Sequence, residues 1–278
     1  MGGSASVRVL TWNVWWRFGP RWSDRQPLLL DEIRASGADV IALEESWGTT
    51  TSTQADEFAR ELGFHSAFAA QSLPPPPDVP EHPGQADVDL GLGLVSRWPI
   101  TATRTVQLPA RHRPEAPVTM IATIAHPDGP VNVVVTCLEW EPAYNDDRIA
   151  QARFVADLAT DPRLDGPAPV LVAGDLNAAP DSPILRPLRD VLVDAWEAGG
   201  GSPDAVSLPS DHPFAPLEAE ELIDRRIDHV LYRFGEPGQR VTVRGARLVG
   251  EPVDGLDPSD HRGVVCEVRW TRPGEASS

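Results

Sequence analysis

Apolar residues along the chain follow two spacings, and each spacing predicts a different kind of element. Segments that alternate apolar and polar residues, or that run apolar with β-branched residues, predict strands. Segments with apolar residues three or four positions apart predict helices over residues 28–36, 53–62, 148–158 and 185–191. The predicted strands cover residues 7–15, 39–44, 91–96, 118–125, 131–138, 170–174, 227–232, 243–249 and 264–270.

These elements alternate in part of the chain and form strand-rich runs in the rest, which favours an α/β or α+β sandwich. Two stretches are rich in Pro, Gly, Ser and Asp. Residues 71–85 are expected to form a surface loop or a mobile lid, and residues 199–217 a second long loop. Because strand segments continue on both sides of each loop, we expect a single domain over residues 1–278, ordered over about 6–271 with short flexible termini.

The composition is that of a chain with a sizeable core, since 41% of the 278 residues are hydrophobic and 23% are charged. No apolar run reaches the roughly 18 residues that a membrane helix needs, so no membrane span is expected. The first residues carry neither a basic cluster nor an apolar stretch, which predicts no secretory signal. Cys137 and Cys266 lie in apolar runs typical of buried free thiols, and a cytoplasmic protein is expected.

The formal net charge of −17 argues against long-range attraction to a nucleic-acid backbone. It leaves open a nucleic-acid substrate that is held locally by a metal ion. All 24 basic residues are arginines, so a phosphate-binding loop that depends on lysine is excluded.

One predicted strand ends in a pair of polar residues. In VLVAGDLNAAPDSP, Asp175 and Asn177 stand two positions apart and therefore leave the strand on the same side. A carboxylate beside an amide can hold a nucleophilic water and steady a phosphate. Because Gly, Asp, Asn and Pro are also turn formers, a plain turn is the alternative.

Two segments nearer the end of the chain carry further candidates. In LDPSDHRGVVCEV, Asp260 and His261 precede a strand. Asp260 suits a cation ligand and His261 suits a general base or acid; the alternative is a solvated surface pair. In RRIDHVLYR, Asp228 enters an apolar strand and needs a partner. That partner is either a catalytic histidine or one of the neighbours Arg225 and Arg226.

Two segments near the start place polar residues in apolar surroundings. RVLTWNVWW puts Asn13 in an apolar and aromatic strand, where its amide must be hydrogen-bonded or bound to a ligand. DVIALEESW ends an apolar strand with Glu44 and Glu45. Strand alternation alone leaves open which of these two glutamates faces a site.

In their order along the chain, these segments resemble the endonuclease/exonuclease/phosphatase superfamily, the metal-dependent phosphoesterases related to deoxyribonuclease I, AP endonucleases, neutral sphingomyelinases and inositol-phosphate phosphatases. The resemblance implies a four-layer sandwich of two mixed β-sheets flanked by helices, with the site at one end of the sheets. The matching elements run from residue 7 to about residue 270 and are TWNVWW, IALEES, GLGLVSRWPI, GDLNAAPDSP, RIDHVL and SDHRGVV.

The same resemblance implies a metal centre. Oxygen ligands suit Mg²⁺ or Mn²⁺ rather than zinc. Glu45 would bind the metal, Asp260 would help to hold it, and Asn13 would sit near the metal and the phosphate. Glu45 is chosen over Glu44 because the acidic position of the family follows a residue that is usually Gln.

The resemblance also implies catalytic roles for four side chains. Asp175 and Asn177 would position water and phosphate. His261 would act as a base or as a phosphate contact, oriented by Asp228. The bound metal would neutralise phosphate charge during in-line attack by water.

One position departs from the family pattern. Many relatives end the corresponding strand in Thr-His-Leu, whereas VVVTCLEW has Cys137 in place of the histidine. A neutral thiol is a weak donor and supplies no imidazolium charge. Tyr144 and Asn145 are the candidates for a compensating donor.

Several tryptophans lie close to the motif segments. Trp12 and Trp98 are expected in the core. Trp47 and Trp140 follow predicted site strands, so each either lines the cleft or packs inside.

The sequence therefore predicts a divalent-metal-dependent phosphoester hydrolase, most directly a phosphodiesterase or nuclease that uses activated water. A phosphomonoesterase acting on a small metabolite or lipid headgroup is the alternative among enzymes. A non-catalytic binding relative, with Cys137 marking lost chemistry, is the alternative outside them. The expected partner is a phosphoester substrate, either a small molecule or a nucleic acid, and no protein partner is evident from the sequence.

Overall fold

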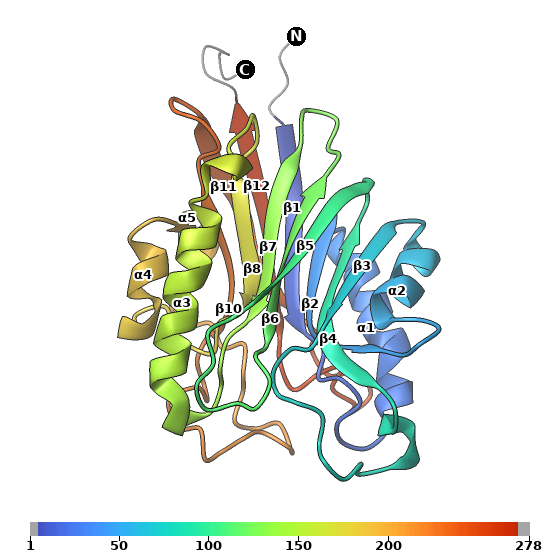
Figure 1. Cartoon of the computed structure of the whole chain (residues 1–278). Coiled ribbons are helices and arrows are strands. Elements are labelled where there is room, and N and C mark those ends of the chain that lie inside the picture. Colours follow the sequence, from blue (N-terminus) through green and yellow to red (C-terminus); the bar gives the residue numbers. More distant parts are fainter. Residues whose placement is uncertain (1–4, 272–278) are drawn as a thin grey trace.

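Two six-stranded β-sheets pack face to face in the computed structural model, which describes residues 5–271 (Figure 1). The strand order is β11-β12-β1-β2-β4-β3 in the first sheet and β5-β6-β7-β8-β10-β9 in the second. The pairs β1–β2 and β7–β8 are parallel and their neighbours are antiparallel, so both sheets are mixed. The strands are β1 (Ala5–Asn13), β2 (Val40–Gly48), β3 (His65–Ala70), β4 (Asp89–Ser96), β5 (Ile100–Gln107), β6 (Val118–Ile124), β7 (Val131–Cys137), β8 (Val170–Asp175), β9 (Val193–Asp194), β10 (Asp228–Arg233), β11 (Arg240–Val249) and β12 (Gly263–Thr271).

Helices cover the two outer faces of the sandwich (Figure 1). Leu29 of α1 and Phe58 of α2 pack in one apolar cluster with the first sheet, and Val155 of α3 packs in another with the second. This arrangement confirms the expected four-layer sandwich. The helices are α1 (Trp22–Ser36), α2 (Gln54–Leu62), α3 (Asn145–Ala159), α4 (Arg186–Arg189) and α5 (Ala195–Ala198), with 3-10 turns η1 (Pro83–Gln85), η2 (Pro142–Tyr144), η3 (Pro162–Leu164) and η4 (Pro183–Leu185).

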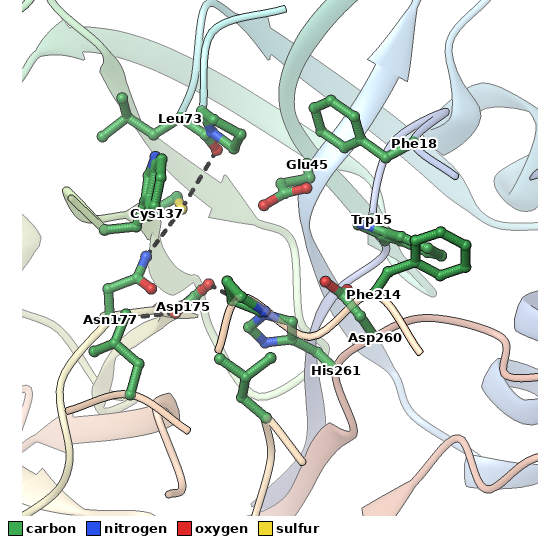
Figure 2. Close-up of a pocket in the computed structure, with 15 residues that line it drawn as sticks. Trp15, Phe18, Glu45, Leu73, Cys137, Asp175, Asn177, Phe214, Asp260 and His261 are labelled. Atoms are coloured by element: carbon green, nitrogen blue, oxygen red, sulfur yellow. Dashed lines mark hydrogen bonds and ion pairs between the residues drawn. The ribbon is translucent and has the colours of Figure 1, made fainter. Parts of the chain in front are cut away.

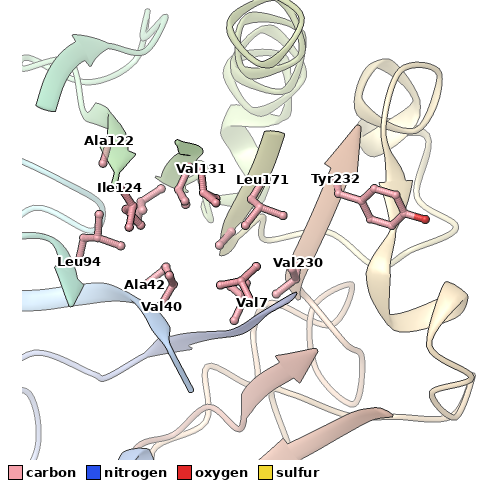
Figure 3. Close-up of a cluster of buried hydrophobic side chains, with 14 of the residues drawn as sticks. Val7, Val40, Ala42, Leu94, Ala122, Ile124, Val131, Leu171, Val230 and Tyr232 are labelled. Carbon is pink, nitrogen blue, oxygen red and sulfur yellow. The ribbon is translucent and has the colours of Figure 1, made fainter. Parts of the chain in front are cut away.

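The central strands bury both of their faces, which is why they read as nearly continuous apolar runs. In β1, Val7 and Val9 belong to the core between the sheets, whereas Leu10 and Trp12 belong to the cluster under α1 and α2. Figure 3 shows side chains of both sheets meeting in the inter-sheet core. Strand alternation therefore decides, residue by residue, which layer a side chain enters.

The sequence did not predict β3, β5 and β9, and all three are edge strands. Most residues of β5 are exposed, so Thr, Ala and Arg replace the apolar alternation of a buried strand. β9 has only two residues. Helix α1 begins at Trp22 rather than at residue 28, because the helix tolerates Pro27 within its length.

Residues 71–85 and 199–217 form the two expected loops, and Leu73 of the first is buried in the inter-sheet core. The flexibility expected of the termini concerns residues 1–4 and 272–278, which lie outside the described part of the chain. Within residues 5–271, no helix combines the length and apolar character that crossing a membrane requires.

Candidate active site

The inter-sheet faces of five strands change from apolar to polar at one end of the sandwich. In β1, the alternation that places Val7 and Val9 between the sheets puts Thr11 and Asn13 on the same face. The apolar core thus ends in a cluster of polar side chains that the strands themselves bring together. The other members of this face are Glu44 of β2, Cys137 of β7, Asp175 of β8 and Asp228 of β10.

A β-bulge in β2 brings Glu45 to the same place. Strict alternation would send Glu45 into the layer under the helices, where Leu43 lies. The register of β2 against β4 shifts directly after Leu43, and Glu45 has a φ of 51°. A bulge re-aims a side chain in this way. Glu44 is fully buried and accepts a hydrogen bond from Thr11 Oγ1 at 2.9 Å, whereas Glu45 faces the cavity described below.

Asn13 links two carboxylates. Its Nδ2 donates to Glu45 Oε1 at 2.9 Å and to Asp175 Oδ2 at 3.1 Å. Its Oδ1 accepts a hydrogen bond from the backbone N–H of Trp15 at 3.0 Å. The expectation that Asn13 sits near the metal and the phosphate stays a prediction, and the geometry favours an orienting role over direct ligation because the amide oxygen is engaged with the backbone.

Asp228 and His261 form a buried pair, with Asp228 Oδ2 2.9 Å from His261 Nδ1. Two serine hydroxyls hold the backbone of this pair. Ser259 Oγ accepts the His261 N–H at 3.2 Å, and Ser207 Oγ accepts the Asp228 N–H at 3.2 Å. On the other side of the ring, His261 Nε2 lies 3.9 Å from Asp175 Oδ2. The imidazole is therefore flanked by two carboxylates.

The alternative partners for the Asp228 carboxylate, Arg225 and Arg226, are wrong. Arg225 donates to the Asp224 carbonyl, and Arg226 reaches only the backbone carbonyl of Asp228, at 3.3 Å. The guanidinium of Arg226 donates to Asp194 Oδ2 at 2.6 Å and to His229 Nδ1 at 2.9 Å. Since arginine only donates, His229 accepts at Nδ1 and donates from Nε2 to the Ala178 carbonyl at 2.9 Å. This buried network fixes the segment that follows β8.

A cavity of about 180 Å³ opens in front of these groups (Figure 2). Asn13 and Asp228 lie behind it and contact residues of its wall. The seven residues singled out from the sequence thus converge on one place. Five of them line the cavity: Glu45, Asp175, Asn177, Asp260 and His261. The remaining lining residues are Trp15, Phe18, Leu73, Pro74, Cys137, Trp140, Leu208, Phe214, Pro216 and Leu222.

Burial and crowded negative charge shift the ionisable groups of this site. Burial, followed by the charge of Asp260, raises the pKa of Glu45 to about 8. Burial and the charge of Asp228 raise the pKa of Asp175 to about 7. Burial alone would lower the pKa of His261, but the surrounding carboxylates outweigh it and raise that pKa well above its usual range. At neutral pH the site therefore holds a cationic imidazole beside carboxyl groups that keep part of their protons.

The donor set fits a hard divalent cation. Asp228 Oδ1 is buried without a hydrogen-bond partner. The pKa values of Glu45 and Asp175 are raised first by burial and then by the charges of neighbouring carboxylates, which a bound cation would offset. The cavity wall adds the carboxyl groups of Glu45 and Asp260. Oxygen-rich sites of this kind suit Mg²⁺ or Mn²⁺. Asp175, Asp228 and His261 also bring polar atoms within 4.8 Å of one another, although a His261 ring protonated on both nitrogens has no lone pair for a metal.

Cys137 lies at the end of β7, opposite Asp175 of β8, where the family resemblance led us to expect histidine. Its Sγ lies 3.6 Å from the Leu73 carbonyl oxygen and 4.0 Å from Asn177 Nδ2. Burial and the nearby carboxylates raise the pKa of the thiol well above its usual range, so it stays neutral. Cys137 therefore contributes shape rather than charge to the cavity wall.

Neither candidate for a compensating donor lines the cavity. The Tyr144 ring stacks on His112 at 4.6 Å between centroids. Asn145 Oδ1 accepts a hydrogen bond from the buried Arg148. Both side chains are thus occupied at the start of α3, away from the carboxylates.

The tryptophans divide between core and site. Trp12 is fully buried and Trp98 packs against the inter-sheet core, as expected. Trp140 lines the cavity. Trp47 instead packs in a small apolar cluster with Trp16. Of the two tryptophans left open by the sequence, Trp140 therefore lines the cavity and Trp47 packs inside.

Sequence reasoning missed Arg25, which is 1% exposed in α1. Its guanidinium donates to the carbonyl oxygens of Trp15 and Phe18 at 3.2 and 2.8 Å and lies 4.3 Å from the Trp15 ring centroid. Arg25 therefore holds the loop that presents two cavity-lining aromatic rings. It precedes the predicted start of the helix, so no helical pattern marked it. Phe214, in the irregular loop 199–217, carried no periodic signal either.

The two mixed sheets with their outer helices form the deoxyribonuclease I-like fold, and the cavity lies at the strand ends of that fold. The chain belongs to the endonuclease/exonuclease/phosphatase family, whose model matches residues 10–261. A comparison with curated protein sequences gave no match.

Solved structures share the fold. D. rerio TDP2, humanized by 14 mutations, is 19% identical with a TM-score of 0.72, and the match covers 95% of this chain and 98% of that one. The human Nocturnin catalytic domain with bound sulfate is 19% identical with a TM-score of 0.70, covering 98% and 97%. An endonuclease/exonuclease/phosphatase from Beutenbergia cavernae is 25% identical with a TM-score of 0.68, covering 97% of this chain and 72% of that one.

Proposed function

We propose that the chain is a divalent-metal-dependent phosphodiester hydrolase that cleaves by direct attack of water, without a covalent intermediate. The observation that carries this proposal is the buried Asp228–His261 pair facing Asp175 in a single carboxylate-lined cavity. Membership of the endonuclease/exonuclease/phosphatase family supports the same reaction class.

Asp175 is the proposed proton acceptor. Its pKa of about 7 leaves it partly ionised at neutral pH, which is the condition for an effective general base. Asn177 stands beside it in the cavity wall, anchored by a hydrogen bond from its Nδ2 to the Leu138 carbonyl at 2.9 Å. Together they would position the attacking water and the phosphate.

His261 is the proposed phosphate contact. With its pKa raised well above the usual range, the ring carries a proton on both nitrogens at neutral pH. Nδ1–H donates to Asp228, which fixes the plane of the ring, and Nε2–H would donate to a phosphate oxygen. The cationic imidazole would also stabilise the charge that develops on that oxygen.

Glu45 and Asp260 are the proposed metal ligands, and Asn13 orients Glu45 through its amide N–H. Mg²⁺ or Mn²⁺, when bound there, would neutralise phosphate charge and stabilise the leaving oxygen. The cytoplasmic location expected from the sequence stays a prediction.

Single-stranded DNA is a second candidate substrate. A D. rerio TDP2 structure complexed with single strand DNA product has a TM-score of 0.71 to this chain, at 18% identity over 95% of this chain and 99% of that one. That likeness concerns the fold. A phosphomonoester of a small metabolite is the remaining alternative among enzymes.

The test is hydrolysis of bis(p-nitrophenyl) phosphate in the presence of Mn²⁺, Mg²⁺ or EDTA. We expect turnover with a divalent ion, loss of turnover in EDTA, and loss of turnover in His261→Ala. An unchanged rate in His261→Ala would contradict the site assignment. If no metal supports turnover, yet calorimetry shows that Mn²⁺ binds, the phosphodiesterase assignment fails in favour of a phosphomonoesterase or a binding protein.

A further inference from the structure

We propose that the substrate is a phosphodiester with a single negative charge and an apolar or aromatic group next to the phosphate. This inference deepens the proposed function and rests on it. It concerns the half of the cavity that the carboxylates do not occupy, and it separates this substrate class from phosphomonoesters and from long polyanions.

One side of the cavity is an aromatic surface. Trp15, Phe18 and Phe214 lie together beside Glu45 and Asp260 (Figure 2). The ring of Trp15 is 5.5 Å from that of Phe214 between centroids. Arg25 holds the carbonyl oxygens of Trp15 and Phe18, so two of these three rings stand on an anchored backbone. The surface is thus formed before any ligand arrives.

This aromatic surface continues outward. A second cavity of about 570 Å³ shares Trp15, Phe18 and Phe214 with the first. Phe214, which lines both cavities, is 52% exposed. A group attached to a phosphate at the carboxylates would extend over these rings and remove apolar surface from water.

Other residues that line the cavity are apolar as well. Trp140 lines it with Leu208 and Leu222, and these side chains pack in one small cluster with Ile227. Cys137 adds a neutral thiol to the lining. A phosphate held at the carboxylates therefore has further apolar neighbours besides the aromatic surface.

No arginine is among the described residues that line either cavity, and the chain contains no lysine. The nearest buried guanidinium, that of Arg25, is engaged with backbone carbonyls and with the Trp15 ring. Glu81 adds a further carboxyl group to the second cavity.

A phosphomonoester takes a second negative charge at about pH 6. Beyond His261 and a bound metal ion, the described lining of the two cavities offers no guanidinium or ammonium group for that charge, and both ring nitrogens of His82 are engaged with the backbone of Arg17 and Gly84. The flanking phosphates of a polynucleotide would lack such a partner as well.

The experiment compares diesters that share one leaving group. The substrates are the methyl, hexyl and phenyl esters of p-nitrophenyl phosphate, with p-nitrophenyl phosphate itself and the 5′-p-nitrophenyl phosphate ester of a single-stranded oligonucleotide as the charged arms. We expect kcat/KM to be about tenfold higher for the phenyl or hexyl ester than for the methyl ester. The ratio of phenyl to hexyl distinguishes an aromatic substituent from a lipid-like chain. Equal values for methyl, hexyl and phenyl, or fastest cleavage of the monoester or the oligonucleotide, would overturn the inference.

Two variants locate the preference. Phe214→Ala is expected to lower kcat/KM for the phenyl and hexyl esters more than for the methyl ester. Leu217→Ala is the matched control, because Leu217 lies in the same loop, is 61% exposed and does not line either cavity. An equal loss in both variants would assign the effect to the loop as a whole and contradict a role for the aromatic surface.

A binding measurement separates this inference from the proposed function. Calorimetric titration with diphenyl, dimethyl and monophenyl phosphate in EDTA needs no turnover. We expect diphenyl phosphate to bind most tightly, about tenfold more tightly than dimethyl phosphate. If the esters are not hydrolysed but diphenyl phosphate binds in this way, the hydrolase assignment fails and the ligand class stands. Equal binding of all three ligands would overturn the ligand class whatever the rates are.

Discussion

His261 Nδ1 lies 2.9 Å from Asp228 Oδ2, and neither side chain is more than 7% exposed. The ring has a second carboxylate, Asp175, 3.9 Å from Nε2. Carboxylates on both edges hold the imidazole in its cationic form, so both nitrogens donate. Such a ring suits contact with a phosphate oxygen better than removal of a proton. The proton of the attacking water then falls to Asp175.

Asp228→Asn tests this division of roles. The amide has nearly the size of the carboxyl group but removes the charge that holds the His261 proton, so we expect kcat to fall by about 100-fold. The alkaline limb of the kcat–pH profile should also move to lower pH, because the pKa of His261 loses its strongest raising charge. Steady-state hydrolysis of bis(p-nitrophenyl) phosphate across pH measures both effects. Asp157→Asn, on the exposed side of α3, is the control, and an unshifted profile in Asp228→Asn would speak against an oriented imidazolium.

The neighbouring glutamates of β2 make a matched pair. Glu45→Gln removes a proposed metal ligand and should weaken Mn²⁺ binding by about tenfold or more. Glu44→Gln should change that affinity by less than about threefold. Burial and the charge of Asp228 raise the pKa of Glu44 well above its usual range, so an amide replaces a group that is already neutral. Calorimetric titration with Mn²⁺ measures both, and the reverse order of effects would exchange the roles of the two residues.

Much of this fold could be predicted because the central strands bury both faces. Val7, Val9, Leu10 and Trp12 make β1 almost continuously apolar, and the sequence pattern of such a strand is strong. Edge strands lack that pattern: β5 is mostly exposed and β9 is two residues long. The same alternation that builds the core also carries Asn13 to the strand end on the inter-sheet face.

The carboxylates could be located from the sequence, but their surroundings could not. Alternation would turn Glu45 away from the site, and only the bulge after Leu43 brings it back. No local pattern marks a bulge in an apolar strand. The aromatic wall is contributed by loops, and the contact between Trp15 and Phe214 joins positions far apart in the chain. Loop conformation depends on tertiary partners such as Arg25, so sequence periodicity carries no information about it.

The protein without divalent ions should be more stable at about pH 6 than at about pH 8. Glu45 and Asp175 have folded-state pKa values of about 8 and about 7, above the values near 4 of an unfolded chain. Between these limits the folded state binds more protons than the unfolded state, so stability falls as pH rises. The raised pKa of His261 acts in the same direction above the usual histidine range.

Thermal unfolding in EDTA across this pH range measures the effect, which we expect to be a few degrees in Tm. Added Mn²⁺ should raise Tm most at the higher pH, because it binds the ionised carboxylates. Asp175→Asn should flatten the pH dependence in EDTA. If Tm in the absence of metal rose between about pH 6 and about pH 8, the inference that the crowded carboxyl groups of the folded site hold extra protons would be contradicted.

Cys137→Ala should change kcat by less than about tenfold, although the family resemblance led us to expect histidine at this position. The thiol is neutral, and its contacts are weak, at 3.6 Å to the Leu73 carbonyl and 4.0 Å to Asn177 Nδ2. His261 already supplies the imidazolium that the missing histidine would have added. We expect a stability loss of about 1 kcal/mol from the lost packing, measured by denaturant unfolding.

Cys266→Ala is the control for that packing loss, because Cys266 is also fully buried but pairs with Val9 in the middle of the first sheet. Both variants should lose similar stability and keep their hydrolytic rate. If Cys137→Ala alone lost about 100-fold or more in kcat, the thiol would be a participant in the reaction. The proposed roles, with His261 as the sole cationic phosphate contact and Asp175 as the base, would then be incomplete, and the Cys137 thiol at the end of β7 would have to be added to the reacting groups.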